Sequence, residues 1–147
     1  MSEAPSPART CRYEEIPVGM QEQFDYLISP DIYKYFLGAF DDRSPIHVDE
    51  DYAKAHGFSG KVMHGTLLNG FLSHFVGMHF PGKLSFLLAV DLRYSQPCYL
   101  GDSIRLQAKV SQKMDARRII VLDLSFDNLT RGIRAASGRA QVMVKEE

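Results

Sequence analysis

Apolar residues recur at helical spacing most regularly in the stretch "HGTLLNGFLSHFVGMHF". Its apolar positions follow one another at steps of one, three and four, which predicts a largely buried helix over residues 64–79. The opposite side of that helix carries only small residues, so a backbone or a ligand can approach it closely. These small residues are Thr66, Gly70, Ser73 and Gly77.

After this helix the apolar period changes to two, which is typical of half-buried strands. Four segments show it: "AVDLRYSQP", "DSIRLQAKVSQ", "RIIVLDLSFDN" and "RAASGRAQVMVK". A weaker alternation over 24–28 predicts a short first strand, and Ser29 and Pro30 predict the start of a short helix in "SPDIYKYFLGAF". Short connections favour an antiparallel sheet, so we expect the α+β class, with the sheet wrapped around the 64–79 helix.

The composition is that of one globular domain, with 147 residues, 45 % apolar and 24 % charged. Residues 1–11, rich in Pro, Ser and Ala, predict a flexible arm, and 12–147 form the domain. The net charge of −1 gives no field that attracts nucleic acid. No apolar run approaches the roughly 18 residues of a membrane span. We therefore expect neither nucleic acid nor a membrane as a partner.

The two cysteines and the N-terminus predict a compartment. Cys11 and Cys98 belong to no C-x-x-C pair, so they indicate neither a redox motif nor a disulfide framework. The first residues lack the basic-then-apolar pattern of a signal peptide. We expect a reducing, cytoplasmic location.

Candidate chemistry is concentrated in "DDRSPIHVDEDYAKAHGFSGKVMHGTLLNG". Between Asp42 and His47, Pro45 fixes its own φ and disfavours helix at Ser44, so a stiff loop can direct both side chains to one point. A carboxylate beside an imidazole can bind a water molecule and transfer a proton at neutral pH. Alternatively, Asp42 caps a turn and His47 is a partly buried hydrogen-bonding residue. The spacing alone leaves both interpretations open.

His64 and Gly65 begin the predicted buried helix. Free backbone N–H groups and the positive end of the helix dipole favour negative charge there, so a thioester carbonyl oxygen would be polarised. Alternatively, His64 caps the helix and Gly65 permits tight packing. Ser73, two turns further on, is placed to hydrogen-bond a substrate or the Asp42/His47 pair; alternatively, it is a buried serine that bonds its own backbone, which is the more common case.

Other chemistries have little support in the sequence. The five histidines include no H-E-x-x-H and no Cys/His cluster, so we expect no metal site. G-x-S-x-G, the signature of many serine hydrolases, is absent, and so is a Gly-rich phosphate loop.

The order of these parts resembles the MaoC-like, (R)-specific enoyl-CoA hydratases. Their motif is Asp-x-Asn-Pro-[Ile/Leu]-His, an Ala six residues after the His, then His-Gly opening a helix. "PGKLSFLLAVDLRYSQPCYLGDSI" is similar to the stretch that follows in that family. The resemblance covers about Tyr13 to Lys145. The matched residues are Asp42, Pro45, Ile46, His47, Ala53, His64, Gly65 and Ser73.

The resemblance implies a hotdog fold, usually a homodimer, and reversible hydration of trans-2-enoyl thioesters to (R)-3-hydroxyacyl thioesters. In such enzymes the residues matching Asp42 and His47 activate the water, and the Gly65 N–H binds the thioester oxygen. Ser73, His64 and Ser44 would support the site. CoA or acyl carrier protein carries the substrate, and no cofactor takes part.

The chain departs from this motif at two positions. Phe40-Asp41 replaces the family's Ser/Thr-Gly, which adds a carboxylate able to compete with Asp42 for a proton or simply to be solvated. Ser44 replaces the Asn whose amide braces the loop. These departures keep a non-catalytic acyl-thioester-binding protein as an alternative. A thioesterase of this fold usually has a carboxylate on the central helix, and residues 64–79 contain none.

Overall fold

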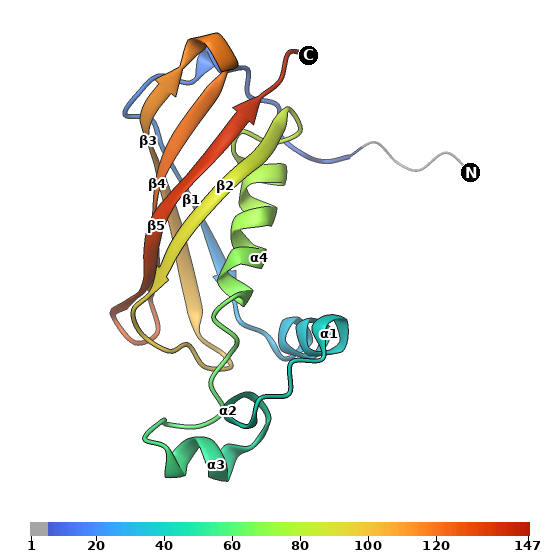
Figure 1. Ribbon diagram of the computed structural model, residues 1–147, viewed down its shortest axis with the longest axis vertical. Coiled ribbons are helices and arrows are strands. Elements are labelled where there is room, and N and C mark those ends of the chain that lie inside the picture. Colours follow the sequence, from blue (N-terminus) through green and yellow to red (C-terminus); the bar gives the residue numbers. More distant parts are fainter. Residues whose placement is uncertain (1–5) are drawn as a thin grey trace, which may run out of the picture.

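The computed structural model describes residues 6–147, which form one antiparallel sheet and a set of helices (Figure 1). The predicted α+β class is confirmed. The strands are β1 (Gln21–Leu27), β2 (Ser85–Tyr94), β3 (Ser103–Met114), β4 (Ile119–Asn128) and β5 (Ile133–Val144). They lie in the order β1-β3-β4-β5-β2.

Helix α4 (Leu67–His74) runs along one face of the sheet and continues as a π-helical turn, Phe75–His79 (Figure 1). It therefore begins three residues later than predicted. The carbonyls of His64 and Gly65 accept hydrogen bonds from the N–H groups three residues ahead, each at 3.0 Å, so a tight turn precedes the helix. The remaining helices are α1 (Pro30–Phe40), α2 (Pro45–Val48), α3 (Glu50–Ala55), and the short 3-10 turns Tyr13–Glu15 and Asp115–Arg117.

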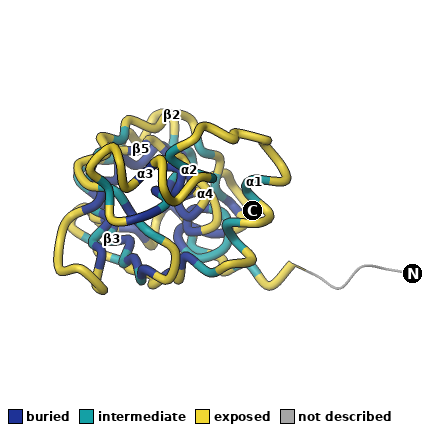
Figure 2. Tube along the Cα trace, turned by 90° about the horizontal axis from the view of Figure 1, so that it is seen from below, coloured by how far each residue is buried: buried dark blue, intermediate teal, exposed yellow. Residues whose placement is uncertain are grey.

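The core forms where the apolar side of α4 meets the sheet. Leu72 and Phe75 of the helical segment and Leu106, Leu122 and Phe126 of β3 and β4 are fully buried in one cluster. Figure 2 shows the buried segments in the interior, with exposed chain around them. The alternation predicted for β3 is observed, and so is that of β4 from Leu122 onward, whereas the first residues of β4, the central strand, are all buried.

The burial expected for β2 is observed at Leu92, which packs against the core, but not at Val90 and Tyr94, which are 37 % and 47 % exposed. The strand also exposes Phe86 and Leu88, at 55 % and 41 %. The reason is its position at the edge of the sheet, where it pairs with β5 alone. Periodicity identifies a strand but does not reveal which strand lies at an edge.

The predicted start of α1 is confirmed. The Ser29 hydroxyl accepts a hydrogen bond from the N–H of Ile32 at 3.1 Å, as an N-cap does. Of the predicted flexible arm, residues 1–5 lie outside the described residues. Further along it, Arg9 and Cys11 donate backbone hydrogen bonds to the carbonyls of Met78 and Pro81. None of the helices within 6–147 combines the length and hydropathy needed to cross a membrane.

Asp102 connects, through hydrogen bonds, the turns at the end of the sheet next to α2 and α3. It is 1 % exposed and accepts hydrogen bonds from the Tyr99 N–H, the Asn128 side-chain amide and the Arg131 guanidinium. We expect Asp102→Ala to lower the free energy of unfolding by about 3 kcal/mol, because it leaves buried donors unpaired. Chemical denaturation measures this change.

A matched control is Asp25→Ala, which removes the exposed ion pair with Arg105 on the neighbouring strand. Solvent screens this pair, so its loss is expected to cost about 1 kcal/mol or less. Equal losses of stability in the two variants would contradict the role given to Asp102.

Candidate active site

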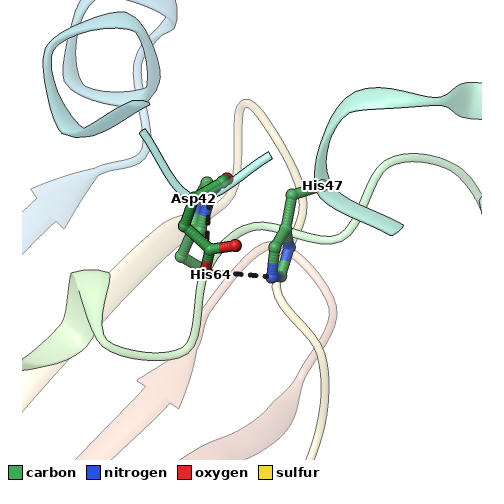
Figure 3. Close-up of side chains that lie close together, drawn as sticks. All are labelled: Asp42, His47 and His64. Carbon is green, nitrogen blue, oxygen red and sulfur yellow. Dashed lines mark hydrogen bonds and ion pairs between the residues drawn. The ribbon is translucent and has the colours of Figure 1, made fainter. Parts of the chain in front are cut away.

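Asp42, His47 and His64 come together beyond the N-terminal end of α4 (Figure 3). Asp42 follows α1, His47 lies in α2, and His64 lies in the loop before α4. The Asp42 Oδ2 atom is 4.0 Å from the Nε2 atom of each histidine. The stiff loop expected from Pro45 therefore does bring Asp42 and His47 to one point.

The orientation of the His47 ring is fixed through its other nitrogen. Its Nδ1 lies 2.7 Å from the carbonyl oxygen of Val62, and a carbonyl can only accept, so Nδ1 carries the proton. In the neutral ring this leaves the Nε2 lone pair directed toward Asp42. Tyr33 holds the backbone of the same residue by donating its hydroxyl to the His47 carbonyl at 2.6 Å.

The Asp42 carboxylate is held by one oxygen and free at the other. Its Oδ1 accepts a hydrogen bond from the Ser44 N–H at 3.2 Å, as in an Asx turn. Its Oδ2 faces the histidines, and 54 % of the side chain is exposed. The 4.0 Å gap to His47 is too long for a direct hydrogen bond, but one water molecule can bridge it. The backbone N–H of Ser44 thus holds the loop through this bond. The bond does not require the Asn side chain that the family has at this position.

His64 holds the loop that carries Asp42. Its ring is 3 % exposed and its Nε2 donates to the Asp42 backbone carbonyl at 2.8 Å. The ring stacks on His47 with centroids 4.0 Å apart and packs against Phe36 at 4.7 Å. The interpretation of His64 as a helix cap is wrong, because its side chain bonds another segment and the helix begins later.

The backbone N–H of Gly65 is free to donate a hydrogen bond. Its N–H makes no hydrogen bond within the described residues, and the residue is exposed in the turn before α4. Gly65, His47 and His64 line a cavity of about 350 Å³. A Cβ at Gly65 would lie 3.3 Å from the ring of Tyr94, so this ring forms a wall beside the N–H.

Ser73 is not brought to this group. It is exposed on α4 and makes no hydrogen bond with Asp42 or His47. Residues nearer to the site are Tyr33, Phe36, Val62 and Tyr94, which sequence reasoning missed. No local pattern marks them, since each reaches the site through a contact with a distant segment.

Asp41 is a surface residue rather than a competitor of Asp42. It ends α1 in the left-handed conformation, with φ 53°, and its carboxylate pairs with the Arg43 guanidinium at 2.6 Å. Its side chain is 76 % exposed. We expect Asp41→Asn, which tolerates this conformation, to change kcat for the hydration that the resemblance implies by less than about twofold, because exposed charges interact weakly. Steady-state kinetics measure this; a loss as large as that of Asp42→Asn would contradict it.

Three of these side chains have the composition of a metal site. One ligand atom each from Asp42, His47 and His64 lie within 4.8 Å of one another. However, His64 Nε2 already carries a proton that it donates to the Asp42 carbonyl. At Nε2, the atom nearest Asp42, His64 therefore has no lone pair to offer, which leaves one ligand atom each from Asp42 and His47 there, fewer than the three protein ligands usual at a catalytic zinc.

Cys98 lines the cavity but is no nucleophile at neutral pH. Burial, with a contribution from the nearby Asp102 carboxylate, raises the pKa of its thiol to about 11. Because the thiolate is the reactive form, the cavity offers no activated sulfur.

The sequence model of the MaoC-like domain matches residues 15–128. The chain belongs to the MaoC-like family. Among MaoC-like relatives, the (R)-specific enoyl-CoA hydratase of Rhodospirillum rubrum is 27 % identical over 132 residues, 90 % of each chain. The 3-hydroxybutyryl-CoA dehydratase of Methylorubrum extorquens is 27 % identical over 110 residues, which are 75 % of this chain and 70 % of the relative.

Solved structures of MaoC-like proteins share the fold. The R-hydratase PhaJ1 of Pseudomonas aeruginosa superposes with a TM-score of 0.87 at 26 % identity, covering 95 % of this chain and 89 % of that one. The (R)-hydratase of Aeromonas caviae gives a TM-score of 0.82 at 24 % identity, covering 89 % and 98 %. The expected hotdog fold is confirmed.

Proposed function

We propose that this MaoC-like protein is a hydro-lyase that adds water reversibly across trans-2-enoyl thioesters to give (R)-3-hydroxyacyl thioesters. Two observations carry the proposal: Asp42 Oδ2 lies 4.0 Å from His47 Nε2, and His47 and Gly65 line one cavity. The names of the relatives, which include hydratases and dehydratases acting on CoA and acyl-carrier-protein thioesters, support the same reaction.

Asp42, His47 and the Gly65 N–H have different roles in the proposed reaction. A water molecule bridging Asp42 Oδ2 and His47 Nε2 bonds through its oxygen to C3 of the enoyl group, while the pair accepts its proton. The pair returns a proton to C2, so charge and atoms balance over the cycle. Charge that develops on the thioester oxygen is stabilised by the Gly65 N–H, which is free to donate. His64 and Ser44 position Asp42.

The reaction needs no cofactor, because hydration changes no oxidation state overall and the site supplies its own proton donor and acceptor. CoA or acyl carrier protein carries the acyl group. Ser73 takes no part in this mechanism. Its predicted support of the site stays a prediction, which the kinetics of Ser73→Ala test.

We also propose a homodimer, formed through the edge of the sheet at β2. This strand has no partner on its outer side within the described residues and exposes Phe86 and Leu88. Light scattering that gives the mass of a monomer would contradict this. The cytoplasmic location stays a prediction, which cell fractionation tests.

The experiment for the proposed function follows the loss of enoyl absorbance when purified protein meets crotonyl-CoA, with chiral analysis of the product. We expect the (R)-3-hydroxy product. Release of free thiol without hydration would favour a thioesterase, and saturable binding without turnover would favour an acyl-binding protein.

A further inference from the structure

A second cavity, of about 590 Å³, lies between β1, α1 and α4. Its walls are almost entirely apolar and largely aromatic. The one imidazole among them, His74, is hydrogen bonded through Nδ1 to the Tyr26 hydroxyl at 2.8 Å, and the residue is exposed, so its Nε2 can stay hydrated. The walls that matter here are Phe24, Tyr26, Ile32, Phe36, Leu67 and Phe71.

This cavity adjoins the candidate active site. Leu67 borders both it and the cavity that contains His47 and Gly65. Phe36 and Gly70 border both it and a hollow of about 430 Å³ that contains Asp42. The Phe36 ring also packs on His64 at 4.7 Å. An extended apolar group that leaves the site along α4 therefore enters this cavity.

Gly70 keeps this junction open. A Cβ built there meets no atom within 4 Å, so the space beside α4 at this point is empty rather than filled by a neighbour. Gly70 borders both hollows, so a larger side chain at this position would occupy space beside both of them without striking the backbone.

We propose that the cavity between β1, α1 and α4 is an acyl pocket, which receives the distal part of a medium-chain enoyl thioester. This inference rests on the proposed function for the position of the thioester. From Gly65 to His74 the chain advances by roughly 13 Å at the helical rise, the reach of an extended acyl chain of about ten carbons. A four-carbon substrate reaches only the catalytic residues and leaves the pocket unused.

The energetic consequence is a preference for longer acyl chains. Each methylene that leaves water for an apolar pocket contributes about fourfold in binding. Because the walls are mostly apolar and the Tyr26 hydroxyl keeps its hydrogen bond to His74, filling the pocket leaves that hydroxyl paired.

The test measures kcat/KM for trans-2-enoyl-CoA substrates of four to twelve carbons in the wild-type protein and in Gly70→Leu. We expect wild-type kcat/KM to rise from four carbons to about ten. Gly70→Leu is expected to lose about tenfold or more with the ten-carbon substrate, and less than about threefold with crotonyl-CoA. Gly38→Leu is the matched control, since it adds the same side chain to α1 at an open position outside the pocket.

A binding measurement separates this inference from the proposed function. Calorimetry compares butyryl-CoA with decanoyl-CoA, neither of which is hydrated. If no enoyl-CoA is turned over but decanoyl-CoA binds more tightly and only Gly70→Leu removes the difference, the hydratase assignment fails and the acyl pocket stands. Equal affinities for the two ligands, or an unchanged chain-length profile in Gly70→Leu, would overturn the acyl pocket.

Discussion

Replacing His47 with glutamine is expected to lower kcat for crotonyl-CoA hydration by about 10²–10⁴-fold, the usual contribution of a positioned acid or base. The hydrogen bond from Nδ1 to Val62 directs the Nε2 lone pair at the water position, and an amide has no comparable basic nitrogen. The protein should remain folded, because the side chain is of similar size and lies at the edge of the core. Steady-state kinetics and circular dichroism measure the two effects.

His56→Gln is the control for this variant. His56 belongs to the same segment, is exposed, and bonds through Nδ1 to the carbonyl of Tyr52 in its own helical turn. Its replacement should leave kcat unchanged within about twofold, since the ring is not among the residues lining the cavity. Full activity in His47→Gln would show that His47 is a hydrogen-bonding residue of the loop and no catalyst.

Replacing Gly65 with proline is expected to lower kcat by about 10²–10³-fold, the cost of removing one oxyanion donor. Proline has no N–H, and this N–H makes no hydrogen bond in the described chain, so the fold loses no bond of its own. The effect should fall on kcat rather than on KM, because the oxygen becomes more negative in the transition state.

Gly65→Ala separates the donor from the shape of the turn. It keeps the N–H and adds a Cβ at 3.3 Å from the Tyr94 ring, which can give way by a small rotation. We expect it to retain most of the activity, while thermal unfolding of both variants reports whether the turn survives. An alanine variant as inactive as the proline variant, with both folded, would show that space beside Tyr94 matters and the N–H does not.

The fold was predictable from the sequence because its signals are local. The helical period around Phe71 and Phe75 and the alternation along β3 each arise within one element, and both are seen in the structure. The edge position of β2 was not predictable, since it depends on which strands pair across the chain. The start of α4 was predicted three residues too early, because the i to i+3 turn at His64 and Gly65 has the same composition as a turn of α-helix.

The candidate site was predictable in part. Pro45 between Asp42 and His47 indicated that the two side chains can converge, but the spacing alone left a catalytic pair and a capped turn both open. It could not show that Val62 sets the His47 tautomer or that His64 holds the Asp42 backbone, because these contacts join segments 15 and 22 residues apart. Whether Asp41 competes with Asp42 for a proton could not be predicted from the sequence either. In the structure the Asp41 carboxylate forms an exposed ion pair with Arg43.

The most direct test of the central claim is the rate of crotonyl-CoA hydration by Asp42→Asn, measured beside Asp41→Asn. The two variants remove the same charge from neighbouring positions, one facing His47 and the other facing solvent. We expect a loss of about 10²-fold or more in Asp42→Asn alone, with both proteins folded. Retained turnover in Asp42→Asn would contradict it.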